Sequence, residues 1–448
     1  MLGQLPQSTQ RDLFRPMLID FIDPGHELVL LANTIDWQYF EDAFKHHYSE
    51  NTGRPSVPIR LMVGCLILKQ MYNYGDETLA QAWVRDVYFQ YFCGMIFFEH
   101  TFPFDPSDFC HFRKRIGVAG FEKIFASSVH IHGKDEVARQ AKFVVSDTTV
   151  QENNTTFPTD SKQRKKVIDY CVKIADKLGI TLRHKYKKES KQLLRDSYNG
   201  HHPKRKGKAK KARKRLQTIA NALLRDLERK MNELQKKRFE KDLEIYKRVV
   251  NQQKDDKDKI YSIHKPFTKC IAKGKADKQY EFGNKTGSIV GGVKGKRLVL
   301  AIKGFIDNLF DGHTINPLLD QMVANKIPLP KELAYDRGGK GKSEIQGVKI
   351  LIPSPPKKKD TEYQKRVKRK KHRSRAGIEP VQGHLKSDFR MAKNYLWGEN
   401  GVEINALMAG AAWNFKKMME RLKENLSDFI FQLVSLRFFP KIGLRAVA

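Results

Sequence analysis

The sequence lacks the features of a secreted, membrane-spanning or zinc-stapled protein. Its five cysteines are scattered, and no two of them have the Cys-x-x-Cys spacing of a zinc ribbon or suggest a disulfide framework. No uninterrupted apolar run is long enough to span a bilayer, and the first residues have neither the basic start nor the apolar run of a signal peptide. We therefore expect a protein of the reducing cytoplasm with no membrane partner.

Negative charge is also scarce. The 448 residues include 84 Lys and Arg against 50 Asp and Glu, which gives a formal net charge of +34. Such a surplus favours a polyanionic partner, most simply nucleic acid. The excess is concentrated in residues 161–260, where 33 Lys or Arg face 13 Asp or Glu, so this block alone supplies +20.

The length of the chain and its changes in composition predict several segments, because 448 residues are too many for one hydrophobic core. We expect a helical N-terminal domain at 1–130, used for DNA-end binding or dimerisation. The first strand of an α/β core follows at 131–160 and a basic helical insertion at 161–275. The remainder of the core, with a C-terminal helix, occupies 276–448.

Two helices are predicted near the N-terminus, one opening at Ile59 after Ser56 and one at 77–92, with a glycine turn between them. This pair fits a DNA-reading helix-turn-helix, but it also fits a plain bundle or a dimerisation surface, which we favour. A third helix ends in a basic run that either contacts DNA or compensates the helix dipole. The run consists of Arg113, Lys114 and Arg115.

The basic insertion is predicted to be a helical hairpin with a short heptad seam. The seam consists of Ala220, Leu224, Leu227, Met231 and Leu234. Its centre, residues 201–215, has no apolar residue except Ala, so we expect a flexible loop when the protein is unbound. The loop is either a solvated charge run or a phosphate-contacting segment that includes Lys204, Arg205 and Lys206.

Short runs of β-branched and aromatic residues predict the strands of the core. One run occupies residues 141–150, and three more, at 279–283, 287–293 and 297–306, suit an antiparallel meander. Next come a helix at 315–324, strands at 332–336 and 348–353, a basic loop to residue 375 and a tail helix at 402–422. The class is therefore α/β.

Three acidic residues stand out against these elements. Asp147 and Asp336 each end an apolar strand, and Glu379 lies between Arg375 and Lys386 in a stretch that we expect to form one helix. The helix is predicted from a stripe formed by Ile378, Gln382, Leu385 and Phe389. Glu379 and Lys386 are two turns apart, so they share nearly the same face, with Arg375 one turn earlier.

The order of these elements is that of an RNase H-like fold with a mixed five-stranded sheet. In that fold the ends of the first and fourth strands, together with a late helix, bring three carboxylates into one cleft. Carboxylates suit Mg²⁺ or Mn²⁺ because hard cations prefer oxygen ligands. Two ions about 4 Å apart activate an attacking water or 3′-hydroxyl and stabilise the leaving oxygen.

Two further acids and one glycine-rich segment are candidates for the same site. Glu281 lies on a predicted strand beside Asp147 and could face the cleft, whereas Asp311 reads as a helix N-cap. Glycines with lysines after Asp336 match a phosphate-binding loop only in part, so this segment is better interpreted as a turn. The glycines and lysines of this segment are Gly338, Gly339, Lys340 and Lys342.

Over nearly its whole length the chain resembles the DDE transposases of bacterial insertion sequences, most closely the insertion-sequence-five group. The N-terminal part contains Gly53-Arg-Pro and the segment ending Phe112-Arg-Lys-Arg-Ile-Gly117, and the second acid lies in the turn Ala334-Tyr-Asp336-Arg-Gly-Gly. The family signature is Tyr, two residues, Arg, three residues, Glu, six residues, Lys. Its places are held here by His372, which departs from Tyr, and by Arg375, Glu379 and Lys386.

The resemblance implies a DNA transposase that binds terminal inverted repeats, cleaves DNA at the element's ends and joins them to a target. Asp147, Asp336 and Glu379 would be catalytic and would hold two Mg²⁺ or Mn²⁺ ions. Arg375 and Lys386 would contact phosphate or the DNA end, and His372 would hydrogen-bond or stack. A homodimer that pairs two ends is expected, as is association with the bacterial nucleoid. The alternatives are a catalytically dead DNA-binding protein and a metal-dependent nuclease of the same fold.

Overall fold

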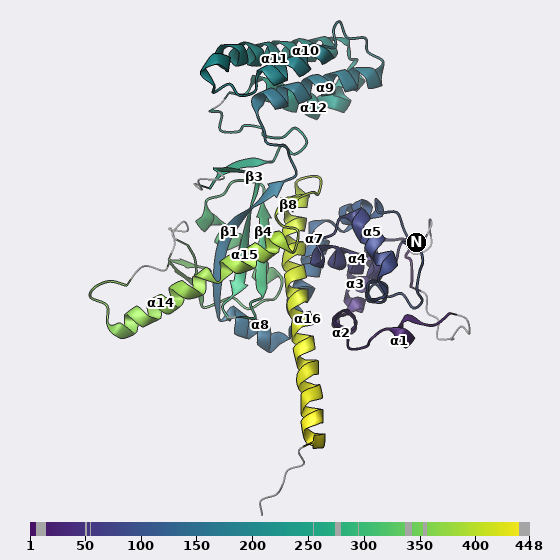
Figure 1. Ribbon diagram of the computed structural model, residues 1–448, viewed down its shortest axis with the longest axis vertical. Helices are drawn as coiled ribbons and strands as arrows, with labels where there is room; N and C mark the ends of the chain where they lie inside the picture. Colours follow the sequence, from purple (N-terminus) through teal and green to yellow (C-terminus); the bar gives the residue numbers. More distant parts are fainter. Residues whose placement is uncertain are drawn as a thin grey trace, which may run out of the picture.

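The computed structural model describes residues 1–5, 15–49, 52–53, 55–253, 255–273, 279–293, 295–336, 343–352 and 356–438, with the side chains of 371, 372 and 428–438 excepted. The chain is a mixed α/β protein in which N-terminal helices flank a central sheet, and a separate helical unit stands at one end of the sheet (Figure 1). Within the described ranges, no helix combines the length and apolarity needed to cross a membrane.

The N-terminal part is a bundle of mostly short helices. They are α1 Leu18–Phe21, α2 Glu27–Thr34, α3 Trp37–Phe44, η1 Lys45–His47, α4 Ile59–Met71, α5 Asp76–Arg85, α6 Val87–Phe92, α7 Asp108–His130 and α8 Lys134–Ala141. The predicted helix opening at Ile59 is confirmed as α4, which is buried along almost its whole length. The predicted single helix at 77–92 is instead two helices. The chain breaks at Asp86, whose carboxylate accepts the N–H groups of Tyr88 and Phe89 at 2.9 and 3.1 Å.

The sheet contains eight described strands, where the sequence predicted five. They are β1 Phe143–Asn153, β2 Lys269–Ala272, β3 Tyr280–Gly291, β4 Val299–Phe305, β5 Glu332–Ala334, β6 Glu344–Ile345, β7 Val348–Leu351 and β8 Lys393–Asn394. β2, β6 and β8 are short additions. The two runs predicted at 279–283 and 287–293 are one strand, β3, because the chain stays extended through its glycines. At Gly283 a Cβ would lie 2.0 Å from the carbonyl oxygen of Gln151, so only glycine lets β3 approach β1 there.

The strands run in both directions. β3 pairs antiparallel with β1 and with β4, whereas β5 pairs parallel with β1 and with β7. Five of the strands therefore lie in the order β4-β3-β1-β5-β7, with β1 at the centre, while β2 pairs with β3, β6 with β7 and β8 with β1. β1 is central because it receives partners from two distant parts of the chain, one before and one after the helix α13 Ile315–Ala324.

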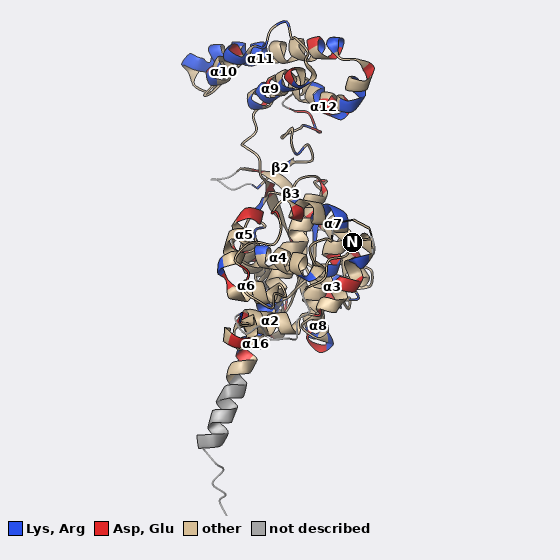
Figure 2. Ribbon diagram, turned by 90° about the vertical axis from the view of Figure 1, so that its right-hand side faces the viewer, with Lys and Arg blue, Asp and Glu red and all other residues tan. Residues whose placement is uncertain are grey.

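The basic insertion forms four helices with a hydrophobic core of their own (Figures 1 and 2). They are α9 Asp160–Leu178, α10 Lys187–Asp196, α11 Pro203–Lys230 and α12 Glu233–Asn251. The prediction of a flexible loop at 201–215 is wrong, because residues 203–215 form the first half of α11. Pro203 suits the first helical turn, Lys and Arg are good helix formers, and Ala209, Ala212 and Leu216 extend the buried seam. Leu234 leaves that seam, since it lies on α12 and is 81% exposed.

The C-terminal part covers the sheet with helices. They are η2 Asp311–Thr314, α13, α14 Glu362–Ala376, α15 Ile378–Ser387 and α16 Asn400–Phe438. The prediction of a basic loop up to residue 375 is wrong for the second half of that stretch. This half forms α14, whose N-terminus is closed by a capping box of Thr361 and Gln364. The single helix predicted from Arg375 to Lys386 is likewise two helices, α14 and α15, which meet at Gly377.

The two faces of the sheet carry different helices. A Cβ on Gly304 of β4 would meet Val402 of α16 at 2.9 Å, whereas one on Gly287 of β3 would meet Leu318 of α13 at 3.0 Å. Gly304 pairs with Thr286, the neighbour of Gly287. Because side chains alternate along a strand, α16 and α13 lie on opposite faces. One hydrophobic cluster continues from α4 and α7 to α16 and the sheet, so the N-terminal helices share the core of the sheet.

Candidate active site

Asp147 lies on β1, and Asp336 lies two residues beyond the end of the neighbouring parallel strand β5, at a matching position. Val145 of β1 is in register with Ala334 of β5, and each aspartate follows its paired residue by two positions. With a side-chain period of two, both aspartates point to the same face of the sheet. The predicted end of the first strand at residue 150 is close to its observed end, but β1 continues past Asp147 to Asn153.

That face is the one covered by α16. Asp147 is opposite Ser288 on β3, and Ser288 is opposite Ile302 on β4. A Cβ on Gly410 of α16 would meet the side chain of Ile302 at 2.8 Å, which places this row of side chains beneath α16. Helix α15 contacts both β1 and α16, so it covers the same face (Figure 1).

The environment of Asp147 disfavours its charged form. Burial raises the pKa of Asp147 to about 6, against the Thr148 backbone N–H and the Arg375 guanidinium, which lower it. The carboxylates of Asp336 and Asp311 raise the pKa of Asp147 further, since like charges repel. The structure therefore brings Asp147, Asp336 and Arg375 into one electrostatic neighbourhood.

The raised pKa of Asp147 predicts a pH-dependent stability in metal-free buffer. A carboxyl whose folded pKa lies above its ordinary 3.8 stabilises the fold below that pH, and the contribution is lost as pH rises toward 6. At about 1.4 kcal/mol for each pH unit, the loss is on the order of 3 kcal/mol. Chemical denaturation with a chelator at pH 4 and pH 7 should show Asp147→Asn relatively more stable than wild type at pH 7. Equal differences at the two pH values would contradict the buried, crowded placement.

Arg375 connects the helices to the aspartate pair. Its Nη2 atom lies 3.2 Å from Oδ2 of Asp336, and it sits in the last turn of α14 rather than on the helix of Glu379. Its Nε is buried and has no hydrogen-bond partner among the described atoms. A buried donor of this kind retains the capacity to bind an oxygen.

Glu379 is on the same side of the sheet but is not assembled with the two aspartates. It occupies the first turn of α15 and is exposed to solvent. Within the residues that the structure describes, no three Asp, Glu, His or Cys side chains lie close enough to hold a metal ion. Two of the three predicted carboxylates thus come together, and their oxygens suit a hard cation; the third faces solvent in this conformation.

The remaining members of the signature have separate positions. Lys386 lies in the last turn of α15 and is half-buried. The side chain of His372, predicted to hydrogen-bond or stack, lies outside the described residues. The predicted turn of Gly338, Gly339, Lys340 and Lys342 also lies outside them.

Asp311 belongs to this neighbourhood although its sequence suggested a helix cap. Its Oδ1 atom accepts the Thr148 hydroxyl at 2.9 Å and the Lys285 ammonium at 2.8 Å, so it caps no backbone N–H through these contacts. Thr148 alternates with Asp147 and points to the α13 face. Asp311 therefore acts on Asp147 from the opposite side of β1, a role that its predicted place as a helix N-cap did not indicate.

Glu281, predicted as a possible neighbour of Asp147, lies far from it along the sheet. It pairs with Ile271 of β2, whereas Asp147 pairs with Ser288. Seven residues of extended strand correspond to roughly 23 Å. Glu281 instead lies 3.8 Å from Lys273 in an ion pair, so it is excluded from the site.

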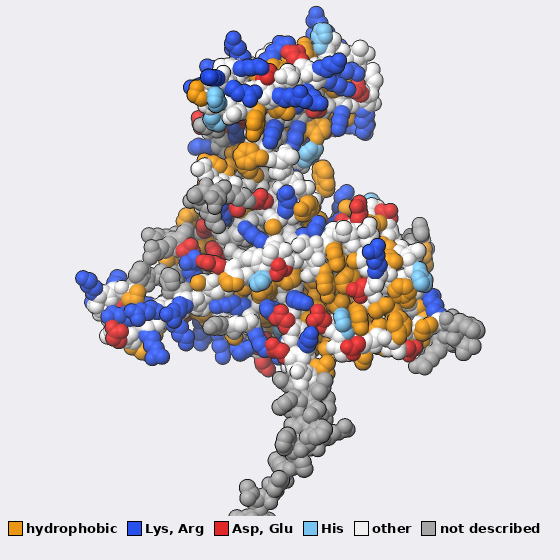
Figure 3. All heavy atoms as spheres, viewed as in Figure 1, with side chains coloured by type: hydrophobic (Ala, Val, Ile, Leu, Met, Phe, Trp, Pro, Cys, Tyr) orange, Lys and Arg blue, Asp and Glu red, His pale blue; other side chains and the backbone are white. Residues whose placement is uncertain are grey.

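The predicted DNA-contacting cations of the insertion lie on its surface. Lys204, Arg205 and Lys206 are exposed in the first turn of α11. Figure 3 shows that basic side chains cover much of the visible face of this helical unit. Cations are disfavoured at a helix N-terminus by the helix dipole. These three cations therefore do not stabilise α11 by themselves, whereas a bound anionic partner would stabilise the N-terminus of this helix.

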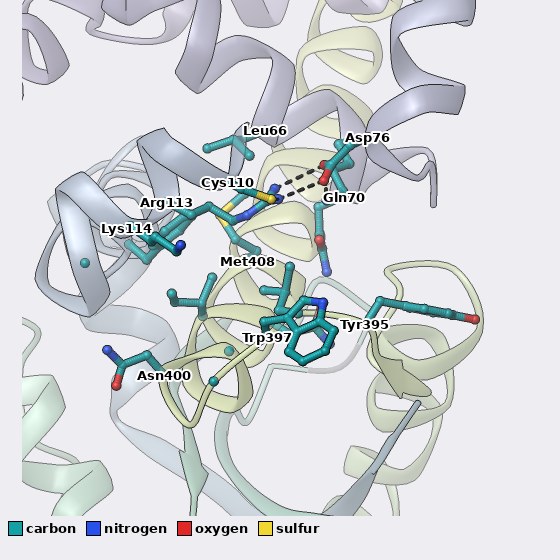
Figure 4. A pocket seen from close by; sticks show the side chains of 18 of the residues that line it. Leu66, Gln70, Asp76, Cys110, Arg113, Lys114, Tyr395, Trp397, Asn400 and Met408 are labelled. Carbon is teal, nitrogen blue, oxygen red and sulfur yellow. Dashed lines mark hydrogen bonds and ion pairs between the residues drawn. The ribbon is translucent and has the colours of Figure 1, made fainter. Parts of the chain in front are cut away.

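The basic run on α7 has two roles. The prediction that Arg113 contacts DNA is wrong, because its guanidinium is buried and bound to Asp76 at 2.7 and 3.1 Å (Figure 4). Lys69 reaches the same carboxylate at 2.5 Å. Lys114 and Arg115 remain exposed, and Lys114 borders a cavity of about 710 Å³ beside this cluster.

Two comparisons with known proteins find similarity to parts of this chain. Residues 16–115, which run from α1 into α7, match the family model described as "Transposase domain (DUF772)". A protein of Rhizobium meliloti, "Uncharacterized protein ORF8 in nfe locus", is 40% identical over 189 residues, which cover 42% of this chain and 91% of that protein. No solved structure matches the chain.

Proposed function

We propose that the chain is a DNA transposase of the DDE type. The premises are that the chain belongs to the family of the nfe-locus ORF8 protein and that its residues 16–115 match a transposase domain. The protein binds the terminal inverted repeats of its element and cleaves DNA at the ends. It then transfers the freed strands to a target by two-metal phosphoryl transfer. Because two ends must be cut together, it acts as a homodimer.

The observation that carries this proposal is the matching position of Asp147, on β1, and Asp336, just beyond the end of the adjacent parallel strand β5. They share the face of the sheet that α15 and α16 cover. The order β4-β3-β1-β5-β7, with two antiparallel and then two parallel pairings, supports an RNase H-like core. In such a core these two positions are where paired carboxylates handle phosphoryl transfer.

The carboxylates fit Mg²⁺ or Mn²⁺ through their oxygen atoms. Asp147 and Asp336 would hold the ions, and Glu379, on the same face, is the third acid that we assign to the set. When bound, such ions polarise the phosphate and lower the pKa of an attacking water or 3′-hydroxyl. Their charge would also relieve the repulsion that raises the pKa of Asp147.

Other side chains position the DNA. Arg375 holds Asp336 through one end of its guanidinium and keeps a buried Nε donor available for a phosphate oxygen. We assign Lys386 to the DNA end because it occupies the last turn of the helix that begins with Glu379. Exposed cations on α7 and α11 bind phosphate elsewhere along the duplex. They are Lys114, Arg115, Lys204, Arg205 and Lys206.

The direct test uses DNA that carries the sequences flanking the coding region. Wild-type protein with Mg²⁺ or Mn²⁺ should bind the inverted ends, nick them, and join pre-cleaved ends to a target plasmid, and chelation should abolish nicking and joining. Gel-shift and sequencing gels measure the three steps separately. Nicking without joining would identify a nuclease instead, and binding without either step would identify a DNA-binding protein.

A further inference from the structure

Helix α14 carries a row of cations on one side. Arg366, Arg369, Lys370 and Arg373 are separated by three, one and three residues, which places them on one helical face. All four side chains are exposed. Figure 3 shows the basic side chains gathered along this helix, at the lower left of the view. They border a cavity of about 950 Å³.

Arg297 lies on the inner wall of the same cavity. It is only 8% exposed, and its guanidinium donates to the carbonyl oxygens of Gly291 at 3.4 Å and Ser374 at 3.1 Å. Burial lowers the pKa of Arg297, and no carboxylate opposes this effect. The guanidinium approaches so closely that a Cβ on Gly377 would lie 2.4 Å from its Nη2 atom. The junction between α14 and α15 is thus shaped around this cation.

The charge of the cavity is one-sided. Its described lining includes Arg297 and the four cations of α14, together with His384, but no Asp or Glu. Like charges one helical turn apart destabilise a helix, and a desolvated cation is stabilised by an anion. A bound anion would reduce the repulsion among the cations of α14 and would stabilise the desolvated guanidinium of Arg297. We call Arg297, Arg366, Arg369, Lys370 and Arg373 the basic groove.

The shape of the basic groove fits a row of phosphates better than a single small anion. From Arg366 to Arg373 the helix rises about 10 Å, which spans about three phosphates of one strand at 3.4 Å each along a duplex. Guanidinium groups, which form the majority of its cations, bind phosphate oxygens in pairs of hydrogen bonds.

The basic groove is connected to the aspartate pair through two consecutive residues of α14. Ser374 accepts the hydrogen bond from Arg297 on the groove side, and the next residue, Arg375, holds Asp336. We propose that the basic groove binds the phosphodiester backbone of the DNA that is cut at Asp147 and Asp336, and thereby sets the position of α14 against the site. This inference rests on the proposed function, since it assigns the path of its substrate.

The test measures the salt dependence of duplex binding without divalent ions, so it does not require activity. The triple variant Arg366→Gln, Arg369→Gln, Arg373→Gln removes three exposed charges and keeps good helix formers. The slope of log K against log salt should become shallower by about two to three, because each phosphate that the protein neutralises accounts for about 0.9 of the slope. The matched control Arg85→Gln, Lys134→Gln, Lys423→Gln removes three exposed charges from other elements and should change the slope by less than about one.

The outcomes separate the basic groove from the proposed function. Equal changes in the salt slope of the two triple variants would mean that the groove cations contribute only general electrostatic attraction to DNA. That result would overturn the inference. If the wild type nicks DNA and Asp147→Asn does not, but the groove variant keeps the wild-type slope, the function stands and the groove assignment fails. If the groove variant alone loses slope while no condition yields nicking, the groove is a DNA site and the catalytic proposal fails. Circular dichroism checks that both variants fold.

Discussion

Asp147→Asn should reduce DNA nicking by about a thousand-fold while binding of the element ends persists. The amide keeps the size of the side chain and loses the charge that would hold a divalent cation. Metal-ion stabilisation of a phosphoryl transition state is worth several kcal/mol, and about 1.4 kcal/mol corresponds to a factor of ten in rate. Nicking rates in Mn²⁺ and gel-shift affinities for the same ends measure the two properties.

The matched control for this result is Asp388→Asn. Asp388 is an acid at the end of α15 whose carboxylate lies 2.7 Å from the ring of His384, and it is exposed. Its variant should nick DNA at close to the wild-type rate. Asp336→Asn should match Asp147→Asn, because each carboxylate follows by two residues a position at which β1 and β5 are paired. Wild-type nicking by Asp147→Asn would remove the assignment of the aspartate pair.

The elements that can be predicted from sequence are those whose signal is local. The long apolar run of α4 and the β-branched residues of β1 and β7 need no knowledge of distant residues. The helices α11 and α14 are mistaken for loops when charge is interpreted as evidence against order. For α14 the signal is present, since Thr361 and Gln364 have the spacing of a capping box.

The candidate site depends on long-range pairing, which limits prediction from a single sequence. The resemblance to DDE transposases selects Asp147, Asp336 and Glu379, but only the parallel register of β1 with β5 shows that the two aspartates are neighbours. Asp311 reaches this neighbourhood through Thr148 and Lys285, both far away in the chain. The break at Gly377 is also hidden, because it follows from the approach of a distant arginine.

Arg113 illustrates how a cation can be assigned to the wrong partner. Its place in a basic run suggests DNA, yet the side chain that binds it, Asp76, lies 37 residues earlier. The buried cluster of Lys69, Asp76 and Arg113 joins α4, α5 and α7 within the part that matches the transposase-domain family. This cluster makes a second prediction with a large effect, on stability rather than on catalysis.

Asp76→Asn should destabilise the protein by about 3 to 5 kcal/mol at pH 7, because it leaves two buried cations facing each other without a carboxylate. Although burial opposes it, hydrogen bonding by Arg113 and the charge of Lys69 hold the pKa of Asp76 below its ordinary value. The surface control Asp42→Asn breaks only an exposed pair with Lys45 and should change stability by about 1 kcal/mol or less. Urea denaturation followed by circular dichroism measures both.

The pKa of Lys69 indicates why Asp76→Asn should lose stability. Burial lowers the pKa of Lys69 to about 8, with the Asp76 carboxylate raising it and the Arg113 charge lowering it further. A lysine whose folded pKa lies below its ordinary 10.5 gains relative stability as pH rises through the folded value, because the neutral amine is the form that burial favours. Without Asp76 the pKa of Lys69 falls further, so the deficit of Asp76→Asn should shrink when Lys69 is also replaced by Met. A deficit that is unchanged in the double variant would mean that the loss arises from α5 packing and not from the unpaired ammonium.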